Sequence, residues 1–399
     1  MALGALIAAY SEDNSGSLKA LIPIAGRTLL EYQVRCAAAA GAAPIVVVVD
    51  RIPIALNEVL QGLQQDGLPV VTVGDAAEAS SRFEAGELIL LIADGLAPSP
   101  ELLSGLADEQ EPVIVTLPDD ESHARFERID GVSRWSGVAL VDAQMIGATA
   151  AMLGDWDLQS TLLRRALQSG ARTAPIFAAS GEPLLAESAN DLTELERRLF
   201  VASRGSRRDW ASRYVLPFIE EFATEKLVET RIRAEMLVQA SLLLSLGAIV
   251  AFGSGWLWVG LALLVLTTPL PLIARRLAAL RLIPMPARTL ARRLLWPTAG
   301  AALVALGWWQ WGHGAGWGAF LAAVSAVAFA EAARIEREKL ELPGEIWLVS
   351  RRNAILAAIP FAAFGAWTSY LVALALYAGA SFFFVQHINH RVGTELTGR

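Results

Sequence analysis

The chain has 399 residues, which is enough for two domains; 54% of them are hydrophobic, and the formal net charge is −7. This mild negative charge gives no support for nucleic acid as a partner. The single cysteine, Cys36, excludes an intramolecular disulfide and is interpreted as a small buried apolar residue.

The first half of the chain alternates short apolar runs with helical segments. Strands are predicted at residues 2–9, 44–50, 69–73, 87–93 and 112–117. Helices are predicted at residues 28–40, 54–65, 100–109 and 148–169. This alternation predicts a doubly wound α/β domain over residues 1–203, with ligands bound at the carboxyl ends of the strands. The apolar start lacks a basic flank and a cleavage site, so we interpret it as a strand of a cytoplasmic domain rather than a signal peptide.

Two loops that follow predicted strands carry polar residues. The first, residues 10–27, is rich in small residues and contains Gly16 and Lys19. Such a loop can present N–H groups and a lysine to phosphates, although a solvated turn fits the residues better on their own. The second loop holds Asp94, which can ligate Mg²⁺ beside phosphates or form an ordinary Asp-Gly turn.

Residues 204–235 connect the two halves of the chain. Apolar residues alternate with charged ones, namely Tyr214, Pro217, Phe218, Phe222 and Leu227 with Glu220, Glu221, Lys226 and Arg231. The pattern predicts an amphipathic helix at the cytoplasmic membrane interface, and a packed linker helix fits it equally well.

The second half, residues 236–399, falls into six long apolar blocks. They lie at residues 236–252, 256–273, 295–311, 317–333, 354–367 and 370–385. Blocks of this length predict an all-α bundle of six transmembrane helices. We split the last two blocks at Thr368-Ser369.

The connections between the apolar blocks differ in charge. Three contain no lysine or arginine, whereas the others carry Arg275, Arg276, Arg281, Arg288, Arg292, Arg293, Arg334, Arg337, Lys339, Arg351 and Arg352. Because basic connections stay in the cytoplasm, the pattern predicts that both termini and the α/β domain are cytoplasmic. The expected location is a bacterial-type inner (plasma) membrane, crossed several times.

Residues 19–30, with the sequence KALIPIAGRTLL, resemble the K-x-L-x-P-x-x-G-x-P-L-L signature of nucleotidyltransferases that act on sugar phosphates and alcohol phosphates. Residues 134–139 look like a later strand of that family, and Asp94 matches its metal-binding aspartate. The resemblance implies a nucleotidyltransferase fold, CTP as the nucleotide, and Mg²⁺ as the cofactor. It also implies nucleotide contacts from Gly16, Lys19, Gly26 and Arg27, and metal contacts from Asp94 and Glu187.

The first domain departs from that family in two places. The family's loop is glycine-rich, whereas here Glu12 and Asp13 precede Gly16, and their charges would repel a triphosphate unless they face away. The family's second metal carboxylate lies in an acidic stretch late in the domain. Glu187 is the candidate for that position in this chain.

The order of parts resembles bifunctional enzymes that join an inositol-phosphate cytidylyltransferase to a CDP-alcohol phosphatidyltransferase. The latter family holds metal with aspartates, yet this chain has no aspartate after Asp209. The membrane half is therefore predicted not to catalyse CDP-alcohol transfer. Arg275, Arg288 and Arg292 are candidates for binding a phosphate or an anionic lipid, and fixing topology is the alternative that we weigh more heavily.

Together these features predict a membrane-anchored nucleotidyltransferase-like protein of phospholipid or polar head-group biosynthesis. In this hypothesis the soluble domain transfers a nucleotidyl group to a phosphorylated alcohol. The alternative is a non-catalytic scaffold or partner subunit of an active lipid synthase. The resemblance also implies a homodimer formed through the membrane half.

Overall fold

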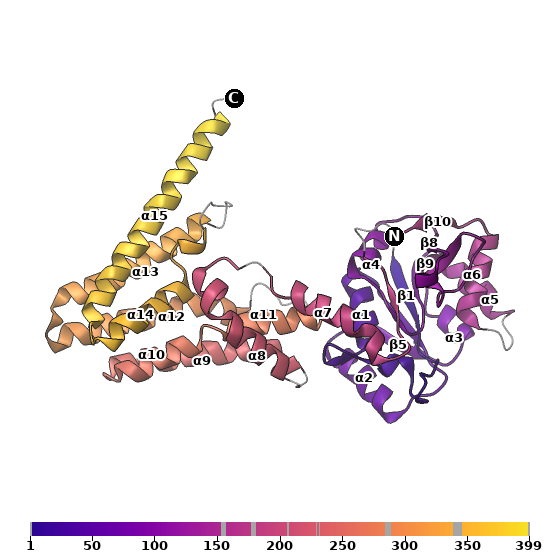
Figure 1. Ribbon diagram of the computed structural model, residues 1–399, viewed down its shortest axis with the longest axis horizontal. Helices are drawn as coiled ribbons and strands as arrows, with labels where there is room; N and C mark the ends of the chain where they lie inside the picture. The colour runs from indigo at the N-terminus through magenta and orange to yellow at the C-terminus, as the bar shows by residue number, and fades with distance from the viewer. Residues whose placement is uncertain are drawn as a thin grey trace. The chain divides into compact units, whose positions relative to one another are not determined.

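The computed structural model describes residues 2–152, 157–176, 181–205, 207–228, 230, 232–283, 289–337 and 345–397, the last seven by backbone only. The chain divides into two compact units. Unit 1 comprises Met1–Ala202 and Leu280–Ile283, and unit 2 comprises Ser203–Ala279 and Pro284–Arg399. We describe each unit by itself (Figure 1).

Unit 1 is built on a seven-stranded sheet with the order β10-β8-β9-β6-β1-β4-β5. The strands are β1 (Leu3–Ala8), β4 (Ile45–Val48), β5 (Val70–Val73), β6 (Leu88–Ile92), β8 (Val113–Pro118), β9 (Ser133–Asp142) and β10 (Arg172–Pro175). Two small antiparallel pairs flank it, β2 (Pro23–Ile24) with β3 (Arg27–Thr28) and β7 (Leu96–Ala97) with β11 (Leu184–Leu185).

The predicted α/β class is confirmed, but the sheet is mixed rather than wholly parallel. Strands β6, β1, β4 and β5 run parallel to one another, whereas β9 runs antiparallel to both β6 and β8. The apolar-run criterion did not identify β9 and β10 as strands, since β9 begins with polar residues and β10 lies at a partly exposed edge. Strand β9 had been anticipated only through the family resemblance.

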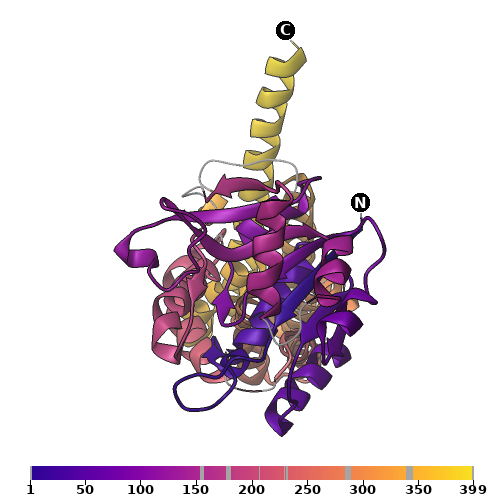
Figure 2. The same cartoon turned by 90° about the vertical axis from the view of Figure 1, so that its right-hand side faces the viewer.

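Helices pack on both faces of the sheet (Figures 1 and 2). They are α1 (Leu29–Ala39), α2 (Ile54–Gln65), α3 (Ala76–Ser80), α4 (Pro100–Ala107), α5 (Ala143–Ala150), α6 (Leu158–Gln168) and α7 (Thr193–Ala202). The single helix predicted at 148–169 is wrong, because two helices lie there. Asp142 accepts a hydrogen bond from the N–H of Gln144 and Asp157 from that of Ser160, so each carboxylate caps a separate helix start.

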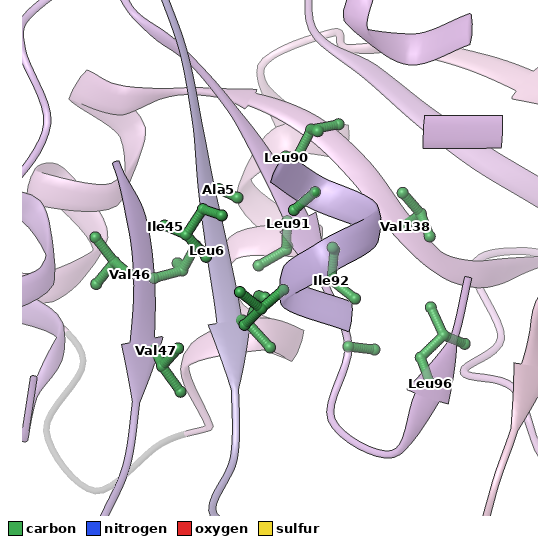
Figure 3. Packing of buried hydrophobic residues seen from close by; sticks show 14 of the residues in the cluster. Ala5, Leu6, Ile45, Val46, Val47, Leu90, Leu91, Ile92, Leu96 and Val138 are labelled. Carbon is green, nitrogen blue, oxygen red and sulfur yellow. The ribbon is translucent and has the colours of Figure 1, made fainter. Parts of the chain in front are cut away.

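The core of unit 1 lies around the three central strands. Leu6, Val46 and Leu90 are at most 1% exposed, and their strand neighbours are similarly covered on both faces (Figure 3). A strand buried on both faces is apolar without alternation. This explains why the sequence identified these three strands correctly.

Unit 2 is helical. Its helices are α8 (Pro217–Val228), α9 (Ala234–Gly253), α10 (Leu257–Leu266), α11 (Leu270–Leu280), α12 (Leu290–Gln310), α13 (Trp317–Arg337), α14 (Arg351–Ala363) and α15 (Trp367–Thr397). Helices α12 and α13 form an antiparallel pair in which small residues permit close approach. A methyl group added at Gly307 would lie 2.7 Å from Cβ of Ala323.

Four helices in the described part of the chain are long and apolar enough to cross a membrane, rather than the six predicted. They lie at Ala234–Gly253, Leu257–Leu280, Trp317–Arg337 and Trp367–His390. Helix α14 has 13 residues, or about 20 Å, against a hydrocarbon core of about 30 Å. Helix α12 has 21 residues, but Arg292 and Arg293 in its first turn and an internal Pro297 lower its hydropathy.

Helix α8 exposes two aromatic side chains and buries two polar ones. Glu220 and Thr224 are buried, whereas Phe218 is 81% exposed and Phe222 is 67% exposed. The faces are mixed, because Glu225 and Lys226 are also exposed and Val228 is buried. The interfacial helix and the packed linker helix both stay predictions.

Gly137 is a point of close backbone approach in unit 1. Its φ is +84°, its carbonyl accepts a 2.8 Å hydrogen bond from the N–H of Ala93, and an added methyl group would lie 2.8 Å from Leu96. We expect Gly137→Ala to lower the free energy of unfolding by roughly 1–3 kcal/mol, because alanine is strained at positive φ. Amide hydrogen exchange of β6 and β9 in the full chain measures the loss.

Gly131→Ala is the matched control. A methyl group there would meet nothing within 4 Å, so exchange in β6 and β9 should be unchanged. Equal hydrogen exchange in the two variants would show that the close approach at Gly137 does not contribute to the stability of β6 and β9.

Candidate functional site

The order of the sheet places a switch point between β1 and β6. From β1 the chain moves outward through β4 to β5, and it then returns to the opposite side of β1 to form β6. Open sheets of this kind bind ligands beside the carboxyl ends of the strands at such a point. Here those ends carry Tyr10 and Ser11 after β1 and Asp94 after β6.

The Asp94 carboxylate joins the ends of these two strands. Its Oδ2 accepts hydrogen bonds from the N–H of Tyr10 (2.9 Å) and the N–H of Ser11 (2.6 Å). Its Oδ1 is buried and has no hydrogen-bond partner among the described residues. Burial raises the pKa of the Asp94 carboxyl, while the two N–H groups and the charge of Lys19 oppose that rise. One carboxylate oxygen is thus held in place and the other is available.

Two buried glutamines hold the loop that carries Asp94. Gln33 of α1 donates to the carbonyl oxygens of Ala93 (3.1 Å) and Leu96 (2.7 Å). Gln159 of α6 accepts from the N–H of Asp94 at 3.2 Å and donates to the carbonyl of Ile92 at 2.9 Å. Sequence analysis missed both residues, because each lies at least 60 positions from the loop. A polar residue on the inner face of an amphipathic helix was the available signal.

Lys19 packs over the glycine that follows Asp94, and its charge acts on the Asp94 carboxyl. Its N–H donates to the carbonyl of Ser11 at 2.9 Å. A methyl group at Gly95 would lie 3.0 Å from Cδ of Lys19 and 3.0 Å from the carbonyl oxygen of Ala186. With a φ of +72° as well, Gly95 is the residue that permits this close approach.

The two acidic residues of the loop before Lys19 are already engaged. Glu12 forms an ion pair with Arg51, which follows β4. The Asp13 carboxylate accepts from the N–H of Ser15 (2.8 Å) and the N–H of Ser17 (2.9 Å), and the Ser15 hydroxyl contact is the main reason that its pKa is lowered. Two N–H groups of the loop are therefore hydrogen-bonded to the carboxylate of Asp13, which belongs to the same loop.

Gly26 and Arg27 lie in the turn between β2 and β3. Ala25 and Gly26 have φ values of +48° and +73°, which a tight hairpin turn requires. The Arg27 guanidinium pairs with Glu31 at 2.8 Å, and Thr28 and Glu31 form a capping box at the start of α1. The structure therefore gives Gly26 and Arg27 contacts that shape the entry to α1.

Glu187 follows the segment that pairs with the Asp94 loop. The N–H of Ala186 donates to the carbonyl of Gly95 at 2.8 Å, and the N–H of Glu187 donates to Asp191 at 3.0 Å. Among the described residues there is no group of three or more histidine, cysteine, aspartate or glutamate side chains that could hold a metal. A cation here would take its remaining ligands from water or a bound phosphate.

In unit 2 the predicted arginines have separate surroundings. Arg275 is exposed, Arg292 lines a cavity of about 50 Å³ together with Glu235, and Arg288 lies outside the described residues. Two carboxylates nearby are paired with other arginines. Asp209 pairs with Arg352, and the buried Glu220 lies 3.7 Å from Arg276.

Comparison with known proteins gives structural likeness alone. No protein-family model and no curated protein sequence matches the chain. A structure described as a glucose-1-phosphate thymidylyltransferase from Bacillus anthracis is 13% identical, with a TM-score of 0.40 over 49% of this chain and 95% of that one. A CTP:phosphocholine cytidylyltransferase from Streptococcus pneumoniae is 16% identical, with a TM-score of 0.37 over 50% of this chain and 100% of that one. Because both scores are below 0.5, we base the function on this chain's own contacts.

The raised pKa of Asp94 predicts a pH-dependent cost to stability. Because the folded-state pKa exceeds the unfolded-state value, ionised Asp94 lowers the free energy of unfolding at neutral pH, and the cost disappears as pH falls through the raised pKa. We expect Asp94→Asn to raise the urea midpoint of unit 1 at pH 8 and to raise it less at pH 5. Pulse proteolysis of the full chain measures both midpoints.

The exposed Asp108 provides the control, and Asp108→Asn should leave both midpoints unchanged. An Asp94→Asn chain that is less stable than wild type at both pH values would contradict the expectation.

Proposed function

We propose that unit 1 binds a nucleoside triphosphate with Mg²⁺ at Lys19 and Asp94 and transfers the nucleotidyl group, with CTP as the expected donor, to a phosphorylated alcohol. The observation that carries this proposal is the Asp94 carboxylate at the switch point, which has one oxygen held by two N–H groups and the other without a partner among the described residues. Lys19 adds a positive charge beside it.

The residues present fit a magnesium ion. Mg²⁺ is commonly held by one or two carboxylates together with phosphate oxygens and water. Oδ1 of Asp94 supplies one such oxygen, and Glu187, two residues after the Leu185 that ends β11, is the proposed second ligand. When bound, the ion would neutralise charge on the triphosphate.

The chemistry proposed for the chain's own residues is positioning and charge neutralisation. An oxygen of the acceptor's phosphate forms a bond to the α-phosphorus, and the bond from that phosphorus to the departing pyrophosphate breaks. Lys19 would neutralise charge on the donor, since a lysine acts on phosphate as a point charge. The Gly16 loop and the Gly26–Arg27 turn would bound the nucleotide.

The membrane half supports a setting in lipid or head-group metabolism. Four helices in the described part of the chain are long and apolar enough to cross a bilayer, and the Phe218 and Phe222 side chains of α8 are exposed. We propose that α8 lies in the head-group region on the cytoplasmic side of a bacterial-type inner membrane, with both termini on that side. Arg275, Arg288 and Arg292 would then face anionic head groups, and a homodimer or a lipid-synthase partner would assemble through this half.

One contact favours the alternative, a non-catalytic scaffold or partner subunit. The N–H groups of Ser15 and Ser17 that would face phosphates are hydrogen-bonded to Asp13. A triphosphate must displace that carboxylate or bind without these two groups. The two functions therefore differ in whether the wild-type loop admits a nucleotide.

Titration calorimetry of the full chain with CTP and Mg²⁺ tests the proposal. Lys19→Met should weaken binding about 10- to 100-fold, since a hydrogen bond to a charged group contributes about 1.5–3 kcal/mol. Arg82→Gln removes an exposed cation of unit 1 that pairs with Glu78, and it should bind like wild type.

The same titration on Asp13→Gly separates the two functions. Wild-type binding that Lys19→Met weakens supports the nucleotidyltransferase. No binding by wild type at millimolar CTP, with binding gained in Asp13→Gly, shows a closed loop and supports the scaffold.

The depth of α8 is measured by cysteine placement, because the one native cysteine, Cys36, is buried. We expect a probe at Phe218→Cys to be quenched by spin-labelled lipid in vesicles more strongly than a probe at Thr224→Cys, since Phe218 is 81% exposed and Thr224 is buried. Equal quenching at the two positions would support a packed linker helix instead.

A further inference from the structure

A small cavity lies among the last four helices of unit 2. It has a volume of about 30 Å³ and is lined by residues of α12, α13, α14 and α15. Its walls are mostly small and apolar, as at Ala299, Gly300, Ala326, Ala330 and Ala354. On α12 the lining positions recur every three or four residues, so one face of this helix forms a wall.

Two residues in the lining of this apolar cavity carry a buried hydrogen-bond donor without a partner. They are Arg351, at the start of α14, with Nη1, and Trp296, on α12, with Nε1. Neither atom has a partner within the part of the chain that the structure describes. Arg351 is also the single charged residue in the lining. Since buried donors in native proteins are nearly always hydrogen-bonded, we expect each donor to have an acceptor, and the cavity that both residues line is the place for it.

The described protein groups around Arg351 do not provide a dedicated counter-charge. Its Nη2 donates to the main-chain carbonyl of Thr267 at 3.2 Å, which is a neutral partner. The carboxylate of Asp209 is engaged by Arg352 and by the N–H of Ser212 at 2.8 Å. Arg351 also stands in the first turn of α14, where the helix dipole is positive. Both the charge and the dipole therefore favour an anion.

The position of Arg351 indicates where that anion comes from. Arg334 and Arg337, in the last turn of α13, and Arg292 and Arg293, in the first turn of α12, mark the same end of the antiparallel helix pair as basic. Basic ends of membrane helices face the leaflet that holds anionic lipids. The cavity that Arg351 lines is also lined by residues of α13 and α15, and both helices are candidate membrane spans.

We propose that this cavity is the head-group end of a binding site for an anionic phospholipid. A phosphate oxygen accepts hydrogen bonds from Nη1 of Arg351 and Nε1 of Trp296, and the acyl chains lie along the apolar surfaces of α12 and α13. The volume of about 30 Å³ accommodates an oxygen atom rather than a whole lipid, so the rest of the molecule lies outside the cavity in the bilayer. This site does not depend on nucleotide binding in unit 1.

Native mass spectrometry of the full chain, purified in mild detergent and supplied with phosphatidylglycerol, tests the site. Wild type should retain one phosphatidylglycerol more strongly than phosphatidylcholine. Arg351→Gln and Trp296→Phe should each weaken retention at least tenfold. Arg293→Gln is the matched control, because it removes an exposed arginine from the same helix outside the cavity, and it should retain the lipid like wild type.

Thermal unfolding with added ligand gives the second measurement. Phosphatidylglycerol should raise the Tm of wild type and of Arg293→Gln more than that of Trp296→Phe. Should Arg351→Gln fail to fold, Trp296→Phe carries the test, since it keeps an apolar aromatic ring while it removes the N–H donor together with one ring of the indole.

Four results would overturn the proposal. In the first, wild type retains no phospholipid, which would leave the cavity to water. In the second and third, Trp296→Phe retains phosphatidylglycerol as well as wild type does, or wild type retains phosphatidylcholine as well as phosphatidylglycerol. In the fourth, inorganic phosphate stabilises the protein as much as phosphatidylglycerol does. The last result would assign the cavity to a soluble anion.

Discussion

The carboxylate of Asp94 determines how the ends of the two central strands meet in unit 1. Two N–H groups that follow β1 converge on one oxygen of a side chain that follows β6, while Gln33 and Gln159 fix the loop from opposite helices. Burying a carboxylate charge in this way is unfavourable unless a cation lies close to it. Lys19 provides part of the positive charge, and the second carboxylate oxygen is available to a further cation.

Unit 2 deals with charge in a different way. Asp209 and Glu220 are buried and each faces an arginine, whereas Arg351 faces a carbonyl group and an apolar cavity. In an apolar setting an unpaired polar or charged group indicates a binding site, because burying it without a partner costs much free energy. No aspartate follows Asp209 in the sequence, so this half lacks hard-cation ligands of that type.

The sequence was most informative where burial alone decides the structure. The apolar runs of β1, β4 and β6 are covered on both faces, so composition identified them. The motifs drew attention to Lys19 and Asp94, and their role as site residues stays a prediction. The sequence was least informative where distant contacts decide. The helix pattern places Gln33 and Gln159 on inner faces, but it does not show that they hold a loop at least 60 residues away. The count of spans failed because the short block at residues 354–367 was taken as a full span, whereas α14 has 13 residues and is too short to cross a bilayer.

The central position of β1 has a consequence for biosynthesis. Strand β1 leaves the ribosome before both of its partners, so it must wait for β4, which ends at Val48, and then for β6, which ends at Ile92. The last strand of the sheet ends at Pro175, well before α9 begins at Ala234. Since chains emerge from the N-terminus and domains fold as units, the whole sheet can be assembled while the first membrane helix is still being translated. Insertion into the bilayer then begins with an already folded domain attached.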